Sequence, residues 1–363
     1  MTTAWTSTHV EAIASQQAAR LPKFAATDVV RPRPELYYWD MWPVQDRDGN
    51  IADISGREFW MILTAPDDGD PAGRHFKAKI HLLERKHANW IDLGPLLPDF
   101  GGPYEREWSG SSIWSEGKFT LWFTGAGLLA SPGGYQQALF ETTADTDQDG
   151  FPVGWSVPRP ILTELTSDYI AADAHEGEAG RIKAYRDPAY FRDPVDGREY
   201  LVFSASRPSG ESEYTGAIGL AENIDHTWTL LPPIIHSGGV NNELERAHIV
   251  FHEGNYLAFW ATQSSTFTPE LQHAPTGLYG MSAKALRGPY EPLNGSGLVL
   301  ANPEDRPAQA YSWSVTRELL VSSFVECADD DCSEFAGAPA PLARLDIGNE
   351  ARDARPVGME TMR

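Results

Sequence analysis

The chain has 363 residues, of which 41% are hydrophobic and 11% aromatic, so it is long enough to bury a sizeable core. Its formal net charge of −22 repels phosphate backbones and anionic membrane surfaces, which argues against nucleic acid and membrane partners but not against a neutral ligand. No run of 18 or more apolar residues is present to span a membrane.

The first 34 residues are expected to form an N-terminal extension that wraps around the main domain. They are mostly polar, with one short helical pattern at residues 10–14. The basic start and apolar run of a secretory signal are not visible in this segment.

From residue 35 to residue 350, short apolar and aromatic runs alternate with clusters of Gly, Pro, Asn and Asp, a pattern that predicts an all-β protein. Five units share one rhythm. In four of them a polar or aromatic signature is followed nine or ten residues later by a turn glycine and then by a strongly apolar strand; the fifth has no turn glycine. In chain order the units begin at Trp39-Asp40, Trp108-Ser109, Arg186-Asp187, Glu245-Arg246 and Tyr311-Ser312-Trp313.

A strand, a turn with Asp-Gly or Glu-Gly, and a second strand together predict an antiparallel hairpin. Five such units, spaced by roughly 60–80 residues, predict a five-bladed β-propeller whose four-stranded blades surround a central channel. Residues 351–363 are then expected to be a C-terminal tail. A pair of β-sandwiches would also give regular short strands, but it offers no reason for carboxylates to recur at the same phase of successive units.

The propeller has a functional consequence, because residues at the start of each innermost strand should converge on one mouth of the channel. Asp40, Asp187 and Glu245 would meet there. Glycoside cleavage through a covalent intermediate needs two carboxyl groups roughly 5–5.5 Å apart, one a nucleophile and one a proton donor with a raised pKa. A third carboxylate can hold sugar hydroxyls and balance the developing positive charge. Taken singly, each of these residues is more often structural.

Arg-Asp-Pro occurs twice, and the two copies are expected to differ in role. Asp187 has the same spacing to its turn as Asp40, whereas Asp193 lies three residues before the Asp196-Gly197 turn. Asp193 should therefore sit at the outer end of the hairpin, and we expect it to be structural. We also expect a raised pKa for Glu245, with a mildly acidic optimum as the consequence.

The two cysteines, Cys327 and Cys332, could form a small disulfide loop in an exported protein or remain free thiols. No Cys/His cluster has zinc spacing, so no metal is expected.

Several stretches, in order from about residue 37 to residue 324, resemble the levansucrase/inulosucrase family, glycoside hydrolase family 68. They are residues 38–43 (YWDMWP), 107–111 (EWSGS), 185–188 (YRDP), 243–248 (ELERAH), 287–300 (RGPYEPLNGSGLVL) and 310–312 (AYS). The run 287–300 is long and specific, and it resembles the Gram-negative-type branch of the family.

The resemblance implies a five-bladed propeller with an axial sucrose pocket, and it implies roles for single residues. Asp40 matches the nucleophile, Glu245 the acid/base, and Asp187 the carboxylate that stabilises the transition state. The remaining matches line the fructosyl site, or orient the carboxylates and hold the glucosyl unit. The fructosyl-site residues are Trp39, Trp108 and Ser109, and the others are Arg186, Glu243, Arg246 and Tyr311.

Three positions depart from the family pattern. Gln263 stands where an Arg or His usually shapes the acceptor side, and Ser204 replaces a common Glu that we also expect on the acceptor side. Asn242 replaces an Asp that binds calcium in Gram-positive members, so no structural calcium site is expected. No cofactor is expected either. The resemblance implies an extracellular location, although no signal is visible.

The sequence therefore predicts a retaining fructosyltransferase that acts on sucrose, with fructan, sucrose or water as acceptor. The alternatives with the same three carboxylates are a mainly hydrolytic β-fructofuranosidase and a transferase that makes short inulin-type oligomers. A non-catalytic carbohydrate-binding propeller, which predicts the loss of a carboxylate, and an inverting arabinan hydrolase are alternatives of other kinds. The expected partners are sucrose and fructo-oligosaccharides, and the sequence gives no oligomeric state.

Overall fold

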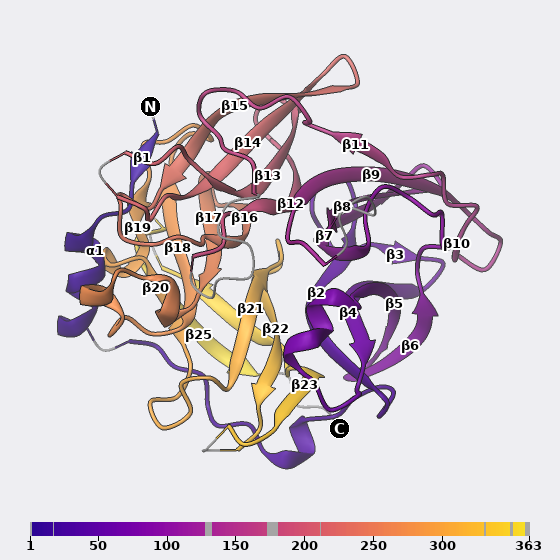
Figure 1. The fold of residues 1–363 in the computed structure, drawn as a ribbon, viewed down its shortest axis with the longest axis horizontal. Helices are drawn as coiled ribbons and strands as arrows, with labels where there is room; N and C mark the ends of the chain where they lie inside the picture. The colour runs from indigo at the N-terminus through magenta and orange to yellow at the C-terminus, as the bar shows by residue number, and fades with distance from the viewer. Residues whose placement is uncertain are drawn as a thin grey trace.

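The computed structural model describes residues 2–16, 18–127, 133–172, 181–210, 212–329, 332–348 and 351–359. Its strands form five antiparallel blades around a central axis, which confirms the predicted five-bladed β-propeller (Figure 1). In each blade one strand lines the axis and the others follow outward, mostly in chain order. The innermost strands are β2 (Leu36–Gln45), β7 (Arg106–Ser115), β12 (Tyr185–Arg192), β16 (Glu245–His252) and β21 (Ala310–Val315).

The outer strands complete the five blades. The first blade adds β4 (Arg57–Pro66), β5 (Lys79–Lys86) and β6 (Asn89–Pro95), with the short β3 (Asp53–Ile54) on β4. The second adds β8 (Lys118–Ala126) and β9 (Gln137–Thr146), on which β10 (Pro152–Val153) and β11 (Arg159–Ile161) pair. The third adds β13 (Glu199–Ser206), β14 (Gly216–Ile224) and β15 (Thr227–His236).

The fourth blade adds β17 (Asn255–Thr262) and β18 (Gly277–Ala283), with β19 (Glu291–Pro292) and β20 (Leu298–Ala301) on β18. The fifth adds β22 (Leu320–Cys327), β23 (Phe335–Pro339), β24 (Ala343–Ile347) and β25 (Ala354–Met359). The first two blades are joined into one sheet, because β2 and β7 pair in parallel at Val44 with Ser112 and at Gln45 with Ile113.

The hairpin turns next to the innermost strands lie where the sequence predicts them. Gly49, Gly117, Gly197 and Gly254 all have positive φ, which glycine adopts at little cost. In the fifth blade the turn between β21 and β22 places Leu319 at a φ of 60°. The fifth turn is therefore of the same kind, although no glycine marks it.

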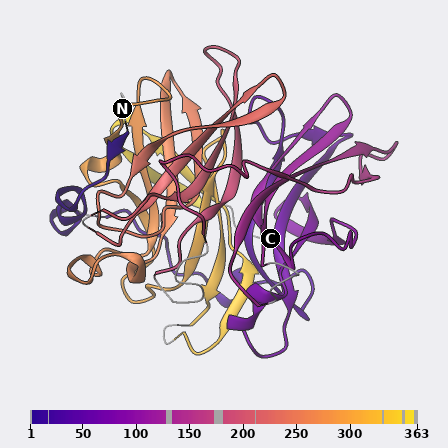
Figure 2. The same ribbon diagram turned by 45° about the horizontal axis from the view of Figure 1, so that its top comes forward.

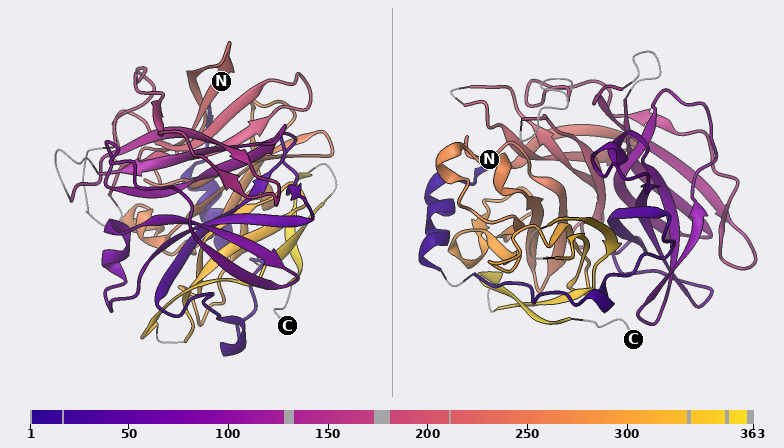
Figure 3. Two further views of the ribbon diagram at one scale, coloured as in Figure 1. Left: turned by 90° about the vertical axis from the view of Figure 1, so that its right-hand side faces the viewer. Right: turned by 60° about the horizontal axis from the view of Figure 1, so that its bottom comes forward.

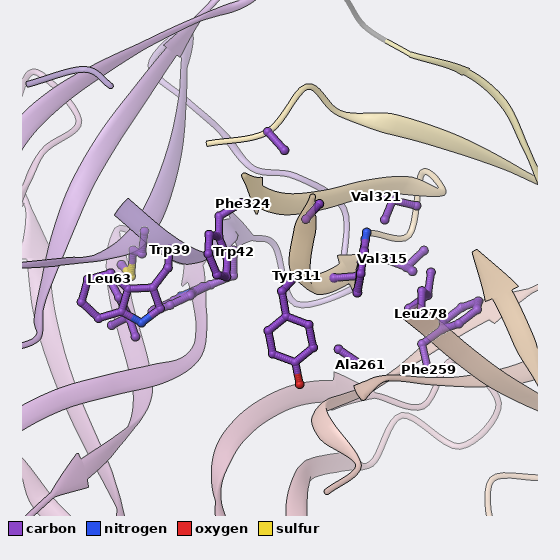
Figure 4. Close-up of a cluster of buried hydrophobic side chains, with 14 of the residues drawn as sticks. Trp39, Trp42, Leu63, Phe259, Ala261, Leu278, Tyr311, Val315, Val321 and Phe324 are labelled. Carbon is purple, nitrogen blue, oxygen red and sulfur yellow. The ribbon is translucent and has the colours of Figure 1, made fainter. Parts of the chain in front are cut away.

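The largest hydrophobic cluster fills the space between the blades around the axis (Figure 4). Trp39, Leu63 and Phe324 belong to it, from the first and fifth blades, and Phe259 and Leu278 add the fourth blade. Shared apolar packing of this kind, rather than strand pairing alone, fixes the blades relative to one another. It therefore holds the start of each innermost strand in a defined place.

The N-terminal segment runs along the outside of the propeller (Figure 2; Figure 3). β1 (Thr3–Ala4) pairs in parallel with β15, and the short helices α1 (Ser7–Glu11) and η1 (Ala12–Ser15) cover the predicted helical pattern. Trp5 is 0% exposed, and its indole nitrogen donates to the Ser296 carbonyl 2.8 Å away. The division at residue 34 stays a prediction.

At the other end of the chain, the structure differs from a simple tail. β25 pairs with β24 in antiparallel register from Ala343 with Met359 to Ile347 with Ala354. Most of the described part of residues 351–363 thus belongs to the fifth blade.

Over the described ranges, none of the helices is both long and apolar enough to cross a membrane.

Candidate active site

Every innermost strand carries a bulge close to its start, where the ladder to the next strand shifts register. A bulge leaves a residue unpaired and re-aims its side chain, and bulges are common beside active sites. The shifts lie between Trp39 and Met41, Trp108 and Gly110, Arg186 and Ala189, Glu245 and His248, and Tyr311 and Ser314.

Four of the bulges hold a non-glycine residue at positive φ. The values are 25° at Asp40, 59° at Asp187, 52° at Arg246 and 58° at Ser312. Such residues cost about 1–3 kcal/mol each and persist only where the surroundings impose them. In the second blade a Cβ at Gly110 would lie 1.9 Å from the Trp122 carbonyl oxygen, so a side chain cannot be accommodated there. The five bulges therefore lie at the strand starts where the sequence shows its repeated signature.

A cavity of about 320 Å³ lies at this end of the axis, within the size range of ligand sites. All eleven catalytic and substrate-binding residues predicted from the sequence line it. They are Asp40, Asp187, Glu245, Trp39, Trp108, Ser109, Arg186, Glu243, Arg246, Gln263 and Tyr311. Asp187 and Arg246 also line a smaller cavity of about 70 Å³, so they lie at the boundary between the two spaces.

Asp40 is held by its neighbour from the second blade. The Ser109 hydroxyl donates to Asp40 Oδ2 over 2.5 Å, a hydrogen bond between the bulges of β7 and β2. A charge-assisted bond of this kind is short and strong, and it fixes the direction of the carboxylate. The other oxygen of Asp40 accepts no hydrogen bond from the described residues, which suits a nucleophile.

Asp187 is anchored from three sides. Its Oδ2 accepts hydrogen bonds from the Ser204 hydroxyl at 3.1 Å and from the Arg246 N–H at 3.3 Å, and its own N–H donates to Thr124 Oγ1 at 2.8 Å. Burial raises the pKa of Asp187, the charge of Arg186 opposes that shift, and the charge of Asp40 adds to it. Asp187 is therefore close enough to Asp40 for the two carboxylates to interact.

Glu245 sits between a cation and a phenol. Arg186 Nη2 donates to its Oε1 over 2.6 Å, and the Tyr311 hydroxyl donates to its Oε2. Figure 4 shows the Tyr311 ring within the buried cluster, with the hydroxyl pointing away from Phe324. Burial and the charge of Glu243 raise the pKa of Glu245 to about 8, Arg186 opposes the shift, and Asp187 raises it further. Glu245 is thus protonated at neutral pH, as a proton donor must be.

Arg186 connects the acidic residues of the third and fourth blades. It is 5% exposed and lies 2.6 Å from Glu245, 3.1 Å from Glu243 and 3.5 Å from Asp187. Burial works against its charge, but the charges of Glu243, Glu245 and Asp187 together raise the pKa of Arg186. It is the counterion that allows these acidic groups to share a buried site.

Two hydrogen bonds and an aromatic ring hold the side chain of Arg246 in place. Its guanidinium donates to Ser312 Oγ at 3.2 Å and to the Met41 carbonyl at 3.0 Å, and it lies 5.6 Å from the Trp42 ring centre. His248 Nε2 accepts from the Val315 N–H at 2.8 Å, so its Nδ1 carries the proton and donates to the Arg246 carbonyl at 2.7 Å. Burial lowers the pKa of His248 to about 4, which keeps this bridge neutral.

Asp193 lies in the turn after β12, at the outer end of the hairpin, where the sequence placed it. It is 4% exposed, and the Tyr256 hydroxyl donates its single proton to the carboxylate, whose two oxygens lie 2.8 and 3.0 Å away. It does not line the cavity.

The expectation for Ser204 was wrong, because this residue is buried on β13 behind Asp187 and not on the acceptor side.

Five charged or aromatic residues of the cavity were missed by the sequence analysis. Arg74 and His75 come from the 3-10 helix η3 (Ala72–Phe76) between β4 and β5, Tyr135 from the connection before β9, and Phe324 and Glu326 from β22. The His75 ring lies 6.0 Å from Trp39 and 6.3 Å from Trp108, between the two predicted fructosyl-site indoles. None of the five stands at the start of an innermost strand, so the argument from the shared phase of the strand starts could not find them.

Asn242, which departs from the calcium-binding pattern, accepts a hydrogen bond from a lysine. Lys183 is buried, and its ammonium donates to Asn242 Oδ1 at 2.7 Å and to Thr215 Oγ1 at 3.3 Å. No group of three or more His, Cys, Asp or Glu side chains arranged for a metal ion is found in the described ranges.

Of the two states considered for the cysteines, a disulfide or free thiols, the structure shows the disulfide. Cys327 and Cys332 form a disulfide, with their Cα atoms 4.9 Å apart, at the end of β22. It follows directly on Glu326 in the chain and ties the end of that strand to the segment before β23.

Known proteins share both the sequence and the fold. The chain matches the levansucrase/invertase family of glycoside hydrolases over residues 1–218 and 206–358. It is 31% identical to a levansucrase of Zymomonas mobilis, over 86% of this chain and 81% of that protein, and 30% identical to a levansucrase of Erwinia amylovora, over 86% and 84%. Both relatives come from Gram-negative bacteria, as the predicted branch implies.

Solved structures agree. An inulosucrase from Halalkalicoccus jeotgali bound to kestose superposes with a TM-score of 0.87 and 32% identity, over 99% of this chain and 96% of that one. A levansucrase from Gluconacetobacter diazotrophicus gives a TM-score of 0.83 at 23% identity, over 98% and 90%, which bears on the fold alone. This chain belongs to the levansucrase/invertase family, glycoside hydrolase family 68.

Proposed function

We propose that this protein is a fructosyltransferase that cleaves sucrose with retention and passes the fructosyl group to fructan, sucrose or water. The observation that carries the proposal is that Asp40, Asp187 and Glu245, remote in the chain, line one cavity in which Glu245 has a pKa of about 8. A non-catalytic sugar-binding propeller has no need of a protonated carboxyl group beside two further carboxylates.

In the first half of the reaction, a carboxylate oxygen of Asp40 attacks the anomeric carbon of the fructosyl unit. The bond from that carbon to the glucosyl oxygen breaks, and Glu245 gives its proton to that oxygen, so glucose leaves. Ser109 holds the other oxygen of Asp40 and so directs the attack. The product is a fructosyl ester of Asp40 and an ionised Glu245.

Positive charge develops on the fructosyl ring as the bond to glucose breaks. Asp187, anchored by Ser204 and the Arg246 N–H, offers a fixed carboxylate to that charge and to the ring hydroxyls. Fixed groups need not reorganise during the reaction, which is the main source of their effect.

In the second half, ionised Glu245 takes a proton from the acceptor hydroxyl, whose oxygen attacks the anomeric carbon and releases Asp40. Arg186 and Tyr311 stabilise the ionised form of Glu245 between the two steps. Water and sugar acceptors differ only at this stage, so the same three carboxylates serve hydrolysis and transfer.

An extracellular location remains part of the proposal. The Cys327–Cys332 disulfide supports it, because such bonds are typical of oxidising compartments.

The proposal is tested by incubating the purified protein with concentrated sucrose and analysing the products. We expect glucose release in excess of free fructose, with the difference recovered in oligosaccharide or polymer. Equal release of glucose and fructose would make the enzyme mainly hydrolytic. Unchanged sucrose would refute the proposal, and linkage analysis of the polymer would give the product class.

A further inference from the structure

A second pair of charged side chains lines the cavity, apart from the Arg186 cluster. Arg74 belongs to the connection between β4 and β5 of the first blade, and Glu326 to β22 of the fifth. The pair therefore lies at the seam between the fifth and first blades, whereas Arg186 and Glu245 come from the third and fourth.

The guanidinium of Arg74 is held between two aromatic rings. Its central carbon lies 4.4 Å from the ring centre of Phe335 and 5.5 Å from that of Trp39. One terminal nitrogen donates to the Pro71 carbonyl at 2.6 Å, but the buried Nε has no hydrogen-bond partner among the described residues. Stacking fixes the plane of the group, so its unused donors have a defined direction.

Glu326 complements Arg74 in charge but does not pair with it directly. Its main-chain N–H donates to the Gln309 carbonyl at 2.9 Å, while its carboxylate accepts no hydrogen bond from the described residues. Burial raises the pKa of Glu326, and the charge of Arg74 opposes that shift. Burial lowers the pKa of Arg74 in turn, opposed by the charges of Glu326 and Asp40.

Both side chains are half-buried at the cavity wall, so their polar atoms that have no partner among the described residues face the space that a ligand would fill. A guanidinium donor and a carboxylate acceptor on one cavity wall, beside aromatic rings, suit the vicinal hydroxyls of a sugar. The leaving group of sucrose is a single ring, for which Arg186, Glu243 and Tyr311 are already present near the proton donor. A saccharide acceptor carries at least one ring more.

We propose that Arg74 and Glu326 bind the hydroxyls of an acceptor saccharide, at the ring beyond the one that receives the fructosyl group. This inference rests on the proposed transferase function and adds a subsite to it. Glu326 accepts hydrogen bonds from that ring, Arg74 donates to it, and Trp39 and Phe335 keep Arg74 in position.

The test measures binding and is independent of turnover. Kestose, the trisaccharide formed when a fructosyl group is transferred to sucrose, reaches beyond the two rings that sucrose occupies. In a Glu245→Gln background, calorimetric titration gives the Kd of kestose and of sucrose, with and without Glu326→Gln. We expect kestose to bind about tenfold more weakly with Glu326→Gln, the factor that a charge-assisted hydrogen bond of ordinary strength supplies, and sucrose to weaken far less.

Arg74→Lys, which keeps the charge but loses the planar donors, should show the same selectivity. Glu334→Gln, at an exposed glutamate of the same blade, is the matched control and should change neither Kd. Equal weakening of both sugars, no weakening of kestose, or no kestose binding at all would overturn the inference. A wild-type protein that leaves sucrose intact, while kestose binding still depends on Glu326, would refute the proposed function and leave the subsite.

Discussion

The guanidinium of Arg186 lies 2.6 Å from a carboxylate oxygen of Glu245, yet the pKa of Glu245 is about 8. A nearby cation alone would lower the pKa of a carboxyl group. Here burial and the charges of Glu243 and Asp187 outweigh Arg186. Glu245 can therefore hold a proton at neutral pH and still be stabilised by Arg186 when it loses that proton.

The first prediction concerns pH. The first step needs protonated Glu245, so kcat/KM for sucrose should fall as the pH rises through about 8. The descending limb then lies above neutrality, so the optimum is not the mildly acidic one expected from the sequence. Initial rates measured across the pH range test this; a descending limb centred near pH 5 would contradict it.

The second prediction changes that pKa. Glu243→Gln removes a negative charge that raises the pKa of Glu245. It also removes one of the two glutamates that pair with Arg186, so the charge of Arg186 acts more strongly on Glu245. Both effects favour ionised Glu245, so the descending limb should move to lower pH. The exposed Glu334→Gln is the control of the same chemistry and should leave the limb in place. A limb that stays at the wild-type position in Glu243→Gln would show that Glu243 does not set the pKa.

The third prediction separates the two Arg-Asp-Pro copies. Asp40→Ala, Asp187→Ala and Glu245→Gln should each lower kcat by several orders of magnitude while the circular dichroism spectrum stays native. Asp193→Ala should instead lower stability, by about 1–3 kcal/mol, because the buried Tyr256 hydroxyl loses its acceptor. Its effect on the kcat of the folded fraction should be far smaller. Loss of activity in Asp193→Ala with retention in Asp187→Ala would invert the assignment.

The fourth prediction concerns Ser204 as a positioning residue. Ser204→Ala removes the hydroxyl that donates to Asp187 at 3.1 Å, so Asp187 should be less well fixed in the transition state. We expect kcat to fall about tenfold with a smaller change in KM. Ser206→Ala, two residues along β13, is the control, because among the described residues its hydroxyl bonds to the Ala184 N–H and to no carboxylate. It should lower Tm without a selective fall in kcat; equal kinetic effects would reduce Ser204 to a structural role.

The fifth prediction concerns the disulfide. The Cys327–Cys332 bond closes a short loop, so its removal should cost no more than about 2 kcal/mol by the loop-entropy relation. Thermal unfolding with and without reductant measures this as a Tm lower by a few degrees. The double variant Cys327→Ser/Cys332→Ser should match the reduced protein and be insensitive to reductant. A wild-type Tm that ignores reductant would show that the bond adds no stability.

The sequence predicted the blades, and the meeting of Asp40, Asp187 and Glu245 at one cavity, for one physical reason, since the five strand starts share a phase that the five bulges then reproduce. Leu319 shows the limit of turn motifs, because a non-glycine residue at positive φ makes the fifth turn. Arg74 and Glu326 lie on a strand connection and at a strand end, where no repeat marks them. Ser204 was placed wrongly because alternation along β13, not family position, decides which face it occupies.

The covalent intermediate on Asp40 is the most direct test of the account. Wild-type enzyme, quenched in acid during turnover of sucrose and digested, should give a peptide containing Asp40 that is heavier by one anhydrofructose unit. Asp40→Ala, treated in the same way, should give no such adduct. Sucrose consumption without an adduct on Asp40, or an adduct on another residue, would contradict the mechanism.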